Sequence, residues 1–199
     1  MGCTGGKKER KGVDFKVARS PKASKRKLLE AKIVLLGDTG VGKSSIVARF
    51  SRDKFLDTHE VTIGSAYFQH RFLLPNGVFV KLHIWDTGGA ERFRSMTHIY
   101  YKNSLGAILV YDITQSNSLD VVKYWMKDLE THEDPKRMVL ALVANKCDQV
   151  PIDLMIKPLG KRYAEDNGMI FRETSALTGQ GIQDLFQIVI DAIIAKFTN

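Results

Sequence analysis

The stretch that decides the fold is residues 32–50, KIVLLGDTGVGKSSIVARF. It begins with a short apolar run, continues through a glycine-rich loop and ends in a segment with a helical pattern. Residues 37–44 of this stretch match the spacing G-x-x-x-x-G-K-[ST]. In such a loop the glycines let the backbone wrap around phosphate groups, and several N–H groups point inward as donors. The strand–loop–helix context therefore predicts a phosphate-binding loop.

Individual side chains of this loop have expected roles. Lys43 is expected to neutralise the β- and γ-phosphate oxygens, and the Ser44 hydroxyl is expected to ligate Mg²⁺. The N-terminus of the following helix adds a partial positive charge. The loop residues predicted to bind nucleotide are Asp38, Thr39, Gly40, Val41, Gly42, Lys43, Ser44 and Ser45.

Two further loops predict which base is bound. Residues 145–148, NKCD, directly follow an apolar strand. The Asp148 carboxylate can accept hydrogen bonds from N1–H and the exocyclic amine of guanine, whereas adenine offers no such donor pair. An unpaired buried acceptor costs about 1–3 kcal/mol, so ATP should be rejected. The predicted base-binding residues are Asn145, Lys146 and Asp148, together with Ser175, Ala176 and Leu177 in a loop whose backbone can reach the guanine oxygen.

The remaining pattern predicts an α/β fold. Apolar runs at 67–74 and 78–85 flank Asn76 and Gly77, a strong hairpin signal. Runs 107–111 and 138–143 are continuously apolar, as expected of strands covered on both faces. Helical stripes follow them. We expect three layers, with a six-stranded, mostly parallel sheet, one antiparallel hairpin strand and five helices on both faces. Ligands then bind beyond the carboxyl ends of the strands.

Charge divides the chain into two parts. Residues 1–31 hold ten Lys and Arg against three acidic residues, and so carry +7 of the net charge of +8. We expect a flexible basic arm over 1–31 and a GTP-binding domain over 32–199. The nearly balanced domain argues against a nucleic-acid partner, and only the arm favours one. No apolar run reaches the roughly 18 residues that a membrane span requires.

Several short segments together resemble one family. They are IGSAY (63–67), KLHIWDTGG (81–89), ERFRSM (91–96), YYKNS (100–104) and VYDIT (110–114). On these motifs the chain resembles a Rab-family small GTPase of the Ras-like superfamily. The segments TIGSAYF (62–68) and YAEDNGMIFRETSAL (163–177) resemble the early-endosomal group, including the atypical Rabs of plants and protists that are N-terminally acylated.

The resemblance implies a cycle between GTP and GDP with Mg²⁺ as cofactor. It implies that Thr62 ligates Mg²⁺ and touches the γ-phosphate, that Asp86 holds Mg²⁺ through water, and that Phe55 packs on the guanine. The implied metal ligands are Ser44, Thr62 and Asp86, and the implied catalytic positions are Lys43, Thr62, Gly89 and Ala90.

The resemblance also implies partners and a location. Effectors would contact Ile63, Tyr67, Trp85 and Tyr100, of which the last three resemble the aromatic triad of Rab proteins. An exchange factor and a GTPase-activating protein would drive the cycle. We expect a monomer on the cytoplasmic face of endosomal or other vesicular membranes that exchanges with the cytosol.

Residues 85–91, WDTGGAE, depart from the Rab pattern W-D-T-A-G-Q-E at Gly88 and Ala90. A methyl group cannot orient a water molecule for attack, so we expect slow hydrolysis even for a class whose unassisted rate is about 10⁻⁴ s⁻¹. The departure is either natural or a deliberate change. A partner that inserts a glutamine would restore hydrolysis; without one, the chain would be a GTP-bound scaffold.

The membrane anchor is also expected to be unusual. Rab proteins ordinarily end in prenylated cysteines, but no cysteine follows Cys147. Either the chain has been cut short or its anchor lies elsewhere. Gly2 fits N-myristoylation, although Gly6 stands where Ser or Thr is favoured, and Cys3 is an expected palmitoylation site. The adjacent basic cluster would add attraction to anionic lipids.

Overall fold

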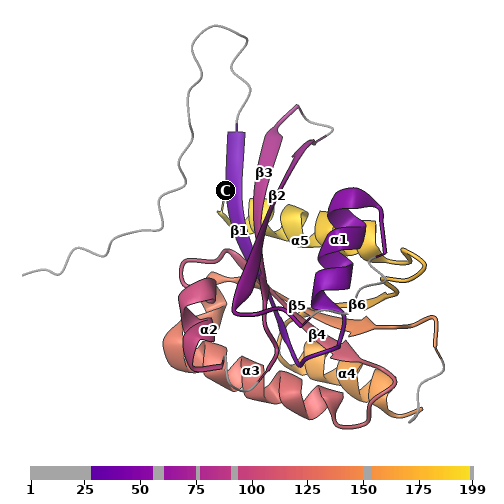
Figure 1. The fold of residues 1–199 in the computed structure, drawn as a ribbon. Coiled ribbons are helices and arrows are strands. Elements are labelled where there is room, and N and C mark those ends of the chain that lie inside the picture. Colours follow the sequence, from indigo (N-terminus) through magenta and orange to yellow (C-terminus); the bar gives the residue numbers. More distant parts are fainter. Residues whose placement is uncertain (1–27, 56–60, 75–76, 91–93, 150–153, 198–199) are drawn as a thin grey trace, which may run out of the picture.

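The computed structural model describes residues 28–55, 61–74, 77–90, 94–149 and 154–197 (Figure 1). Its centre is a six-stranded sheet of order β2-β3-β1-β4-β5-β6, in which the β2–β3 pair is antiparallel and the other pairs are parallel. The strands are β1 (Leu28–Gly37), β2 (Ser65–Leu73), β3 (Phe79–Thr87), β4 (Gly106–Asp112), β5 (Val139–Asn145) and β6 (Ile170–Thr174).

Among the described residues, five α-helices cover the two faces of the sheet, so the predicted three-layer α/β fold is confirmed (Figure 1). They are α1 (Lys43–Arg52), α2 (Arg94–Tyr101), α3 (Ser118–His132), α4 (Ile156–Asp166) and α5 (Ile182–Phe197), with a short 3₁₀ helix at Pro135–Arg137. Helices α1 and α5 pack on one face; α2, α3 and α4 lie on the other. None of the helices in the described part of the chain is both long and apolar enough to cross a bilayer.

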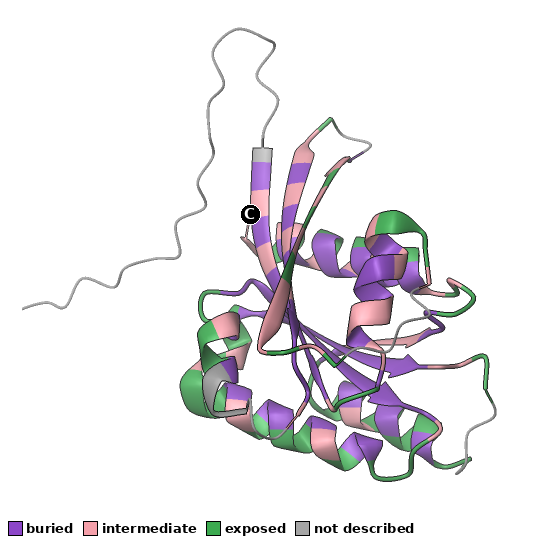
Figure 2. Ribbon diagram, in the orientation of Figure 1, coloured by how far each residue is buried: buried purple, intermediate pink, exposed green. Residues whose placement is uncertain are grey.

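The central strands are buried on both faces because each face has its own apolar cluster. In β1, Ile33 and Leu35 point into the cluster under α1 and α5, whereas Val34 and Leu36 point into the cluster under α3 and α4. Every residue of β4 and β5 is buried, which explains their continuous apolar runs (Figure 2).

Strand β1 begins at Leu28, four residues before the domain start expected at residue 32. Leu28 pairs with Phe79 and Ala31 with Leu82, so this segment extends the sheet along β3. The basic composition of residues 1–31 hid this extension, because Leu28 and Leu29 are too short an apolar run to be recognised as part of a strand.

Helix α4 packs against β4 through a glycine. A Cβ added to Gly160 would overlap the hydroxyl of Tyr111, a side chain that is fully buried. In an exposed helix interior, Gly→Ala usually gains about 1 kcal/mol from helix propensity. Here we expect Gly160→Ala to lose about 1–3 kcal/mol, because the overpacked core must rearrange.

Urea unfolding of Gly160→Ala in two backgrounds tests this prediction. Tyr111→Phe removes the overlapping hydroxyl, which has no hydrogen-bond partner among the described residues. The loss should therefore be smaller in the Tyr111→Phe background than in the wild type. A gain in stability, or the same loss in both backgrounds, would contradict the proposed steric cause.

Candidate functional site

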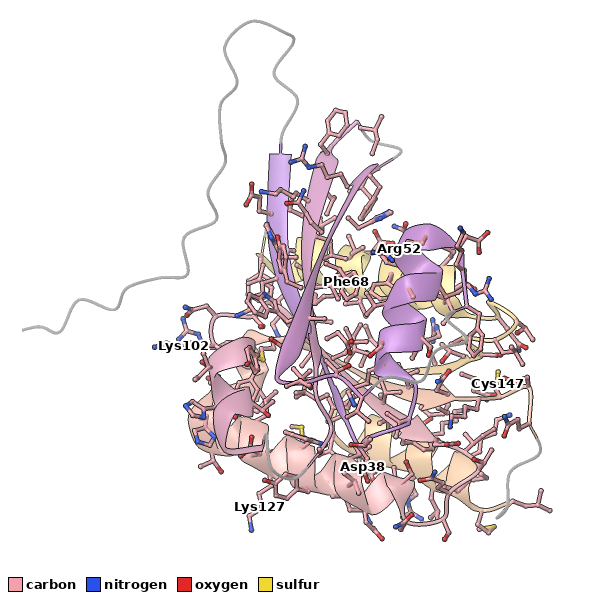
Figure 3. All side chains as sticks on the ribbon, in the orientation of Figure 1. Asp38, Arg52, Phe68, Lys102, Lys127 and Cys147 are labelled. Atoms are coloured by element: carbon pink, nitrogen blue, oxygen red, sulfur yellow. The ribbon has the colours of Figure 1, made fainter. Side chains whose placement is uncertain are left out.

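Loops that follow β1, β3, β5 and β6 meet at one edge of the sheet, as expected for the carboxyl ends of parallel strands. Figure 3 labels Asp38 in the loop after β1 and Cys147 in the loop after β5. The loop after β1 turns into α1 through Gly40 and Gly42, whose φ angles of 77° and 98° lie in the left-handed region. Gly42 also allows a close approach, because an added Cβ would overlap the side chain of Asn145.

The Lys43 side chain is buried beneath this loop. Its ammonium group donates to the carbonyl oxygens of Gly37 at 2.9 Å and Asp38 at 2.7 Å. Burial lowers the pKa of Lys43 to about 8, although the carboxylates of Asp86 and Asp38 partly oppose the shift. The loop therefore encloses a cation that two carbonyl dipoles hold in place.

Three oxygen-bearing side chains meet beside Lys43. Ser44 Oγ donates to Asp86 Oδ2 at 2.5 Å and lies 3.0 Å from Thr62 Oγ1. Asp86 is 1% exposed, and burial raises its pKa against the opposing effects of Ser44, Lys43 and Thr62. Asp86 Oδ1 has no hydrogen-bond partner within the described ranges. Two hydroxyls and a carboxylate with a spare oxygen fit Mg²⁺, which prefers oxygen ligands.

The segment after β3 packs directly against the phosphate-binding loop. An added Cβ on Gly89 would overlap the backbone of Asp38 and Thr39, so only glycine allows this approach. The N–H of Gly88 donates to the carbonyl of Gly64 at 2.8 Å. Ala90, next in the chain, is half-buried and has only a methyl group to present. Two separate segments therefore meet beside the loop at residues 37–44. One contains Thr62, and the other, after β3, contains Gly88 and Gly89.

Asn145 joins three loops from a fully buried position. Its Nδ2 donates to the carbonyl of Val41 at 2.8 Å, and its Oδ1 accepts from Thr174 Oγ1 at 3.0 Å. The amide thereby ties the phosphate-binding loop to the ends of β5 and β6. Sequence reasoning assigned Asn145 to base binding, and this bracing contact is an additional role that the spacing alone did not indicate.

The other predicted base-binding residues surround Asn145. Lys146 adopts a positive φ of 64°, and its ammonium lies 2.6 Å from the buried Asp112 carboxylate. Asp148 is exposed. In the loop after β6, Ser175 and Ala176 are buried and Leu177 is 52% exposed. The sequence analysis did not predict the ion pair between Asp112 and Lys146; its signals were the place of Asp112 at the end of an apolar strand and within the segment VYDIT (110–114).

The remaining predicted positions are placed as follows. Phe55 is half-buried against the apolar cluster under α1 and α5, and its contact with a base stays a prediction. Gly2 and Cys3 lie outside the described residues. The rings predicted to meet effectors form a continuous row, with centroid distances of 5.5 Å from Tyr67 to Trp85 and 5.7 Å from Trp85 to Tyr100. Ile63, 79% exposed, precedes this row in the sequence.

Comparison with known proteins gives one family. The family model described as "Ras family" matches residues 32–195. The Ras-related protein Rab-5B of Plasmodium falciparum is 39% identical over 201 residues, covering 99% of this chain and 96% of that protein. The Ras-related protein RABA5b of Arabidopsis thaliana is 45% identical, covering 81% of this chain and 74% of its own length. The Ras-related protein Rab5 of Nicotiana tabacum is 44% identical, and the match covers 79% of this chain and 78% of that protein.

The buried ammonium predicts an unusual pH dependence of stability for the ligand-free chain. The folded pKa of Lys43 is about 8 and the ordinary value is 10.5, so between these values the unfolded chain binds more protons at this group. Stability from this group therefore rises with pH across that window. We expect Lys43→Met to be more stable than the wild type below about pH 8, by about 3 kcal/mol, and the gap to close near pH 10.5.

Urea unfolding of both chains across this pH range measures the gap. Taking the difference between the two chains removes the contribution of other groups, such as Tyr101, whose pKa is raised by burial. A difference in stability that does not change with pH would mean that the ammonium is not buried as described.

Proposed function

Because this chain belongs to the Ras family, and within it to the Rab small GTPases of the early-endosomal group, we propose that it is a GTP/GDP switch whose own hydrolysis is slowed by Ala90. Members of this family are GTPases that act in membrane traffic, here at endosomes. The proposed cycle of this chain between GTP and GDP would require an exchange factor, an activating protein and effectors.

The observation that carries the proposed switch is the cluster of Ser44, Thr62 and Asp86. Ser44 belongs to the phosphate-binding loop, whereas Thr62 and Asp86 come from two other segments, and their oxygens lie within hydrogen-bonding distance of Ser44. Ligation of one Mg²⁺ by this set would link all three segments. Loss of a terminal phosphate would remove a tether from the Thr62 and Gly89 segments, which would let both relax.

The residues of the site have separate parts in the chemistry. Lys43 would neutralise charge that develops on the β- and γ-phosphate oxygens, and the Gly89 N–H would hold the γ-phosphate. When bound, Mg²⁺ supplies further neutralisation of those oxygens. Ser44 and Thr62 would orient it, with Asp86 acting through water. Asp148 and the loop at 175–177 would select guanine.

The step that lacks a group is the placement of the attacking water. In the Rab pattern a glutamine side chain orients this water. Position 90 here holds an alanine, whose side chain has neither a hydrogen-bond donor nor an acceptor. An activating protein that inserts its own glutamine would restore the step.

The alternative function is a GTP-bound scaffold that recruits effectors, and Ala90 is the observation that favours it. Analysis of the nucleotide that copurifies separates the two, since GDP supports the switch and GTP the scaffold.

We expect Ala90→Gln to hydrolyse GTP at least about tenfold faster than the wild type in single-turnover assays without a partner, because water positioning contributes to the rate in this class. Ala90→Leu is the matched control, since it fills similar space without an amide and should stay slow. Equal rates for the wild type and Ala90→Gln would reject the proposed cause of slow hydrolysis.

We propose that the basic arm attaches the chain to membranes through acylation of Gly2 and Cys3. A single myristoyl chain gives a partition constant of only about 10⁴ M⁻¹, so stable binding needs a second signal. The palmitoyl group and the basic residues at 7–11 would supply it, because each basic residue near an anionic leaflet adds about 1 kcal/mol.

Co-expression with an N-myristoyltransferase and sedimentation with vesicles test the anchor. We expect Gly2→Ala to abolish the mass increase of a myristoyl group and to reduce binding to anionic vesicles by at least about tenfold. Gly5→Ala, a glycine that is not at the acceptor position, should behave like the wild type. Unmodified wild-type protein, or equal binding by Gly2→Ala, would contradict the proposed anchor.

A further inference from the structure

Arg49, in the last turn of α1, bonds to the loop that follows β6. Its Nε donates to the carbonyl of Ala176 at 3.0 Å, and its Nη2 donates to the carbonyl of Leu177 at 2.7 Å. The side chain is 17% exposed, so most of the arginine is shielded from water. Two hydrogen bonds from one planar group fix orientation as well as distance, which a lysine ammonium does not do.

The same guanidinium also holds the end of α1. Its Nη1 donates to the carbonyl of Asp53 at 3.2 Å and lies 3.5 Å from the Asp53 carboxylate. Asp53 ends the helix at a φ of 49°, and its own N–H donates to the carbonyl of Arg49. Phe55, predicted to pack on the base, follows two residues later. One side chain therefore braces both segments that the sequence predicts to flank the base.

The loop at 175–179 is a closed turn that leaves two N–H groups available. Ser175 accepts from the N–H groups of Gly179 at 2.8 Å and Thr178 at 3.1 Å. Gly179 has a φ of +87°, and an added Cβ there would lie 3.6 Å from Arg49 Cδ, so the arginine stem crosses the turn. Within the described part of the chain, the N–H groups of Ala176 and Leu177 make no hydrogen bond.

Peptide geometry links Arg49 to one of these free donors. The carbonyl of Ala176 and the N–H of Leu177 belong to the same planar peptide unit and point in opposite directions. When Arg49 holds the carbonyl, it also sets the direction in which the Leu177 N–H points. Helix α1 begins with Lys43 and Ser44 and carries Arg49 in its last turn, so the same rigid element carries the predicted phosphate-binding side chains and orients this loop.

We infer that Arg49 is a positioning residue for base recognition: by holding the carbonyl of Ala176 it aims the backbone N–H of Leu177 at the 6-oxygen of guanine and so slows nucleotide release. The inference rests on the proposed function, in which this loop binds the base. It assigns Arg49 a role in selectivity that a residue maintaining only the fold would not have.

Release of bound nucleotide from the loaded, full-length chain tests the role of Arg49. GDP is compared with 2-aminopurine riboside diphosphate, which lacks the 6-oxygen and also the N1–H expected to pair with Asp148. Each variant is compared with the wild type on the same nucleotide, so the loss at Asp148 cancels. We expect Arg49→Gln and Arg49→Lys to release GDP roughly tenfold faster than the wild type, as for the loss of a hydrogen bond from a charged group. For the analogue, the increase should fall to less than about threefold, because the group that the loop recognises is absent.

Arg52→Gln is the matched control, since Arg52 is a basic residue of the same last helical turn. Its guanidinium lies 6.0 Å from the ring of Phe68, and Figure 3 labels both side chains near the C-terminal end of α1. The control should release both nucleotides as the wild type does. Arg49 variants that match Arg52→Gln, or that release both nucleotides equally faster, would overturn the inference.

A measurement on the wild type keeps the test independent of whether the variants fold. Hydrogen exchange at the Leu177 amide should slow more with GDP bound than with the analogue bound, and no difference would overturn the inference. Wild-type chain that binds neither nucleotide in the presence of Mg²⁺ would instead overturn the proposed function. The two failures are therefore distinguishable.

Discussion

The structure depends on burying a cation and an anion side by side beneath a glycine-rich turn. Lys43 and Asp86 are both almost inaccessible to water, and both are held by the loop at residues 37–44: Lys43 by the carbonyls of Gly37 and Asp38, and Asp86 by the hydroxyl of Ser44. Burial opposes the charged form of both, lowering one pKa and raising the other. Phosphate and Mg²⁺ are the ligands that would compensate these two charges. The site is thus costly for the ligand-free chain and suited to a highly charged ligand.

Around this charged centre, the loops contact one another directly through glycines. Gly42 lies against Asn145, and Gly89 lies against the backbone of Asp38, so the loops touch where a side chain would not fit. Such contacts can transmit small displacements, because Gly89 meets only backbone atoms and the Asn145 amide that meets Gly42 is fixed by hydrogen bonds to Val41 and Thr174. These contacts would couple a bound terminal phosphate to the segment that follows β3 and, through Trp85, to the aromatic row, in which Tyr67 is exposed and Trp85 and Tyr100 are half-buried.

Helix α1 gives the site its second organising element. Its first turn supplies Lys43 and Ser44, and its last turn supplies Arg49, whose hydrogen bonds reach the loop after β6. A ten-residue helix therefore connects the loop predicted to bind phosphate with the loop predicted to bind the base. Ala90 stands outside these networks, so its effect is expected on the chemical step, while the loops that hold nucleotide remain intact.

The sequence by itself determined the α/β class, the hairpin, the phosphate-binding loop and the set of loops that meet at one sheet edge. These follow from local patterns: glycine spacing, apolar runs and helical periodicity are encoded within a few residues. Only the tertiary structure decided that β1 begins at Leu28, that Asp112 pairs with Lys146, and that Arg49 braces Ala176 and Leu177. Those contacts join residues far apart in the chain. A side chain with several donors could bind many partners, so its actual partner is known only when packing places one within hydrogen-bonding distance.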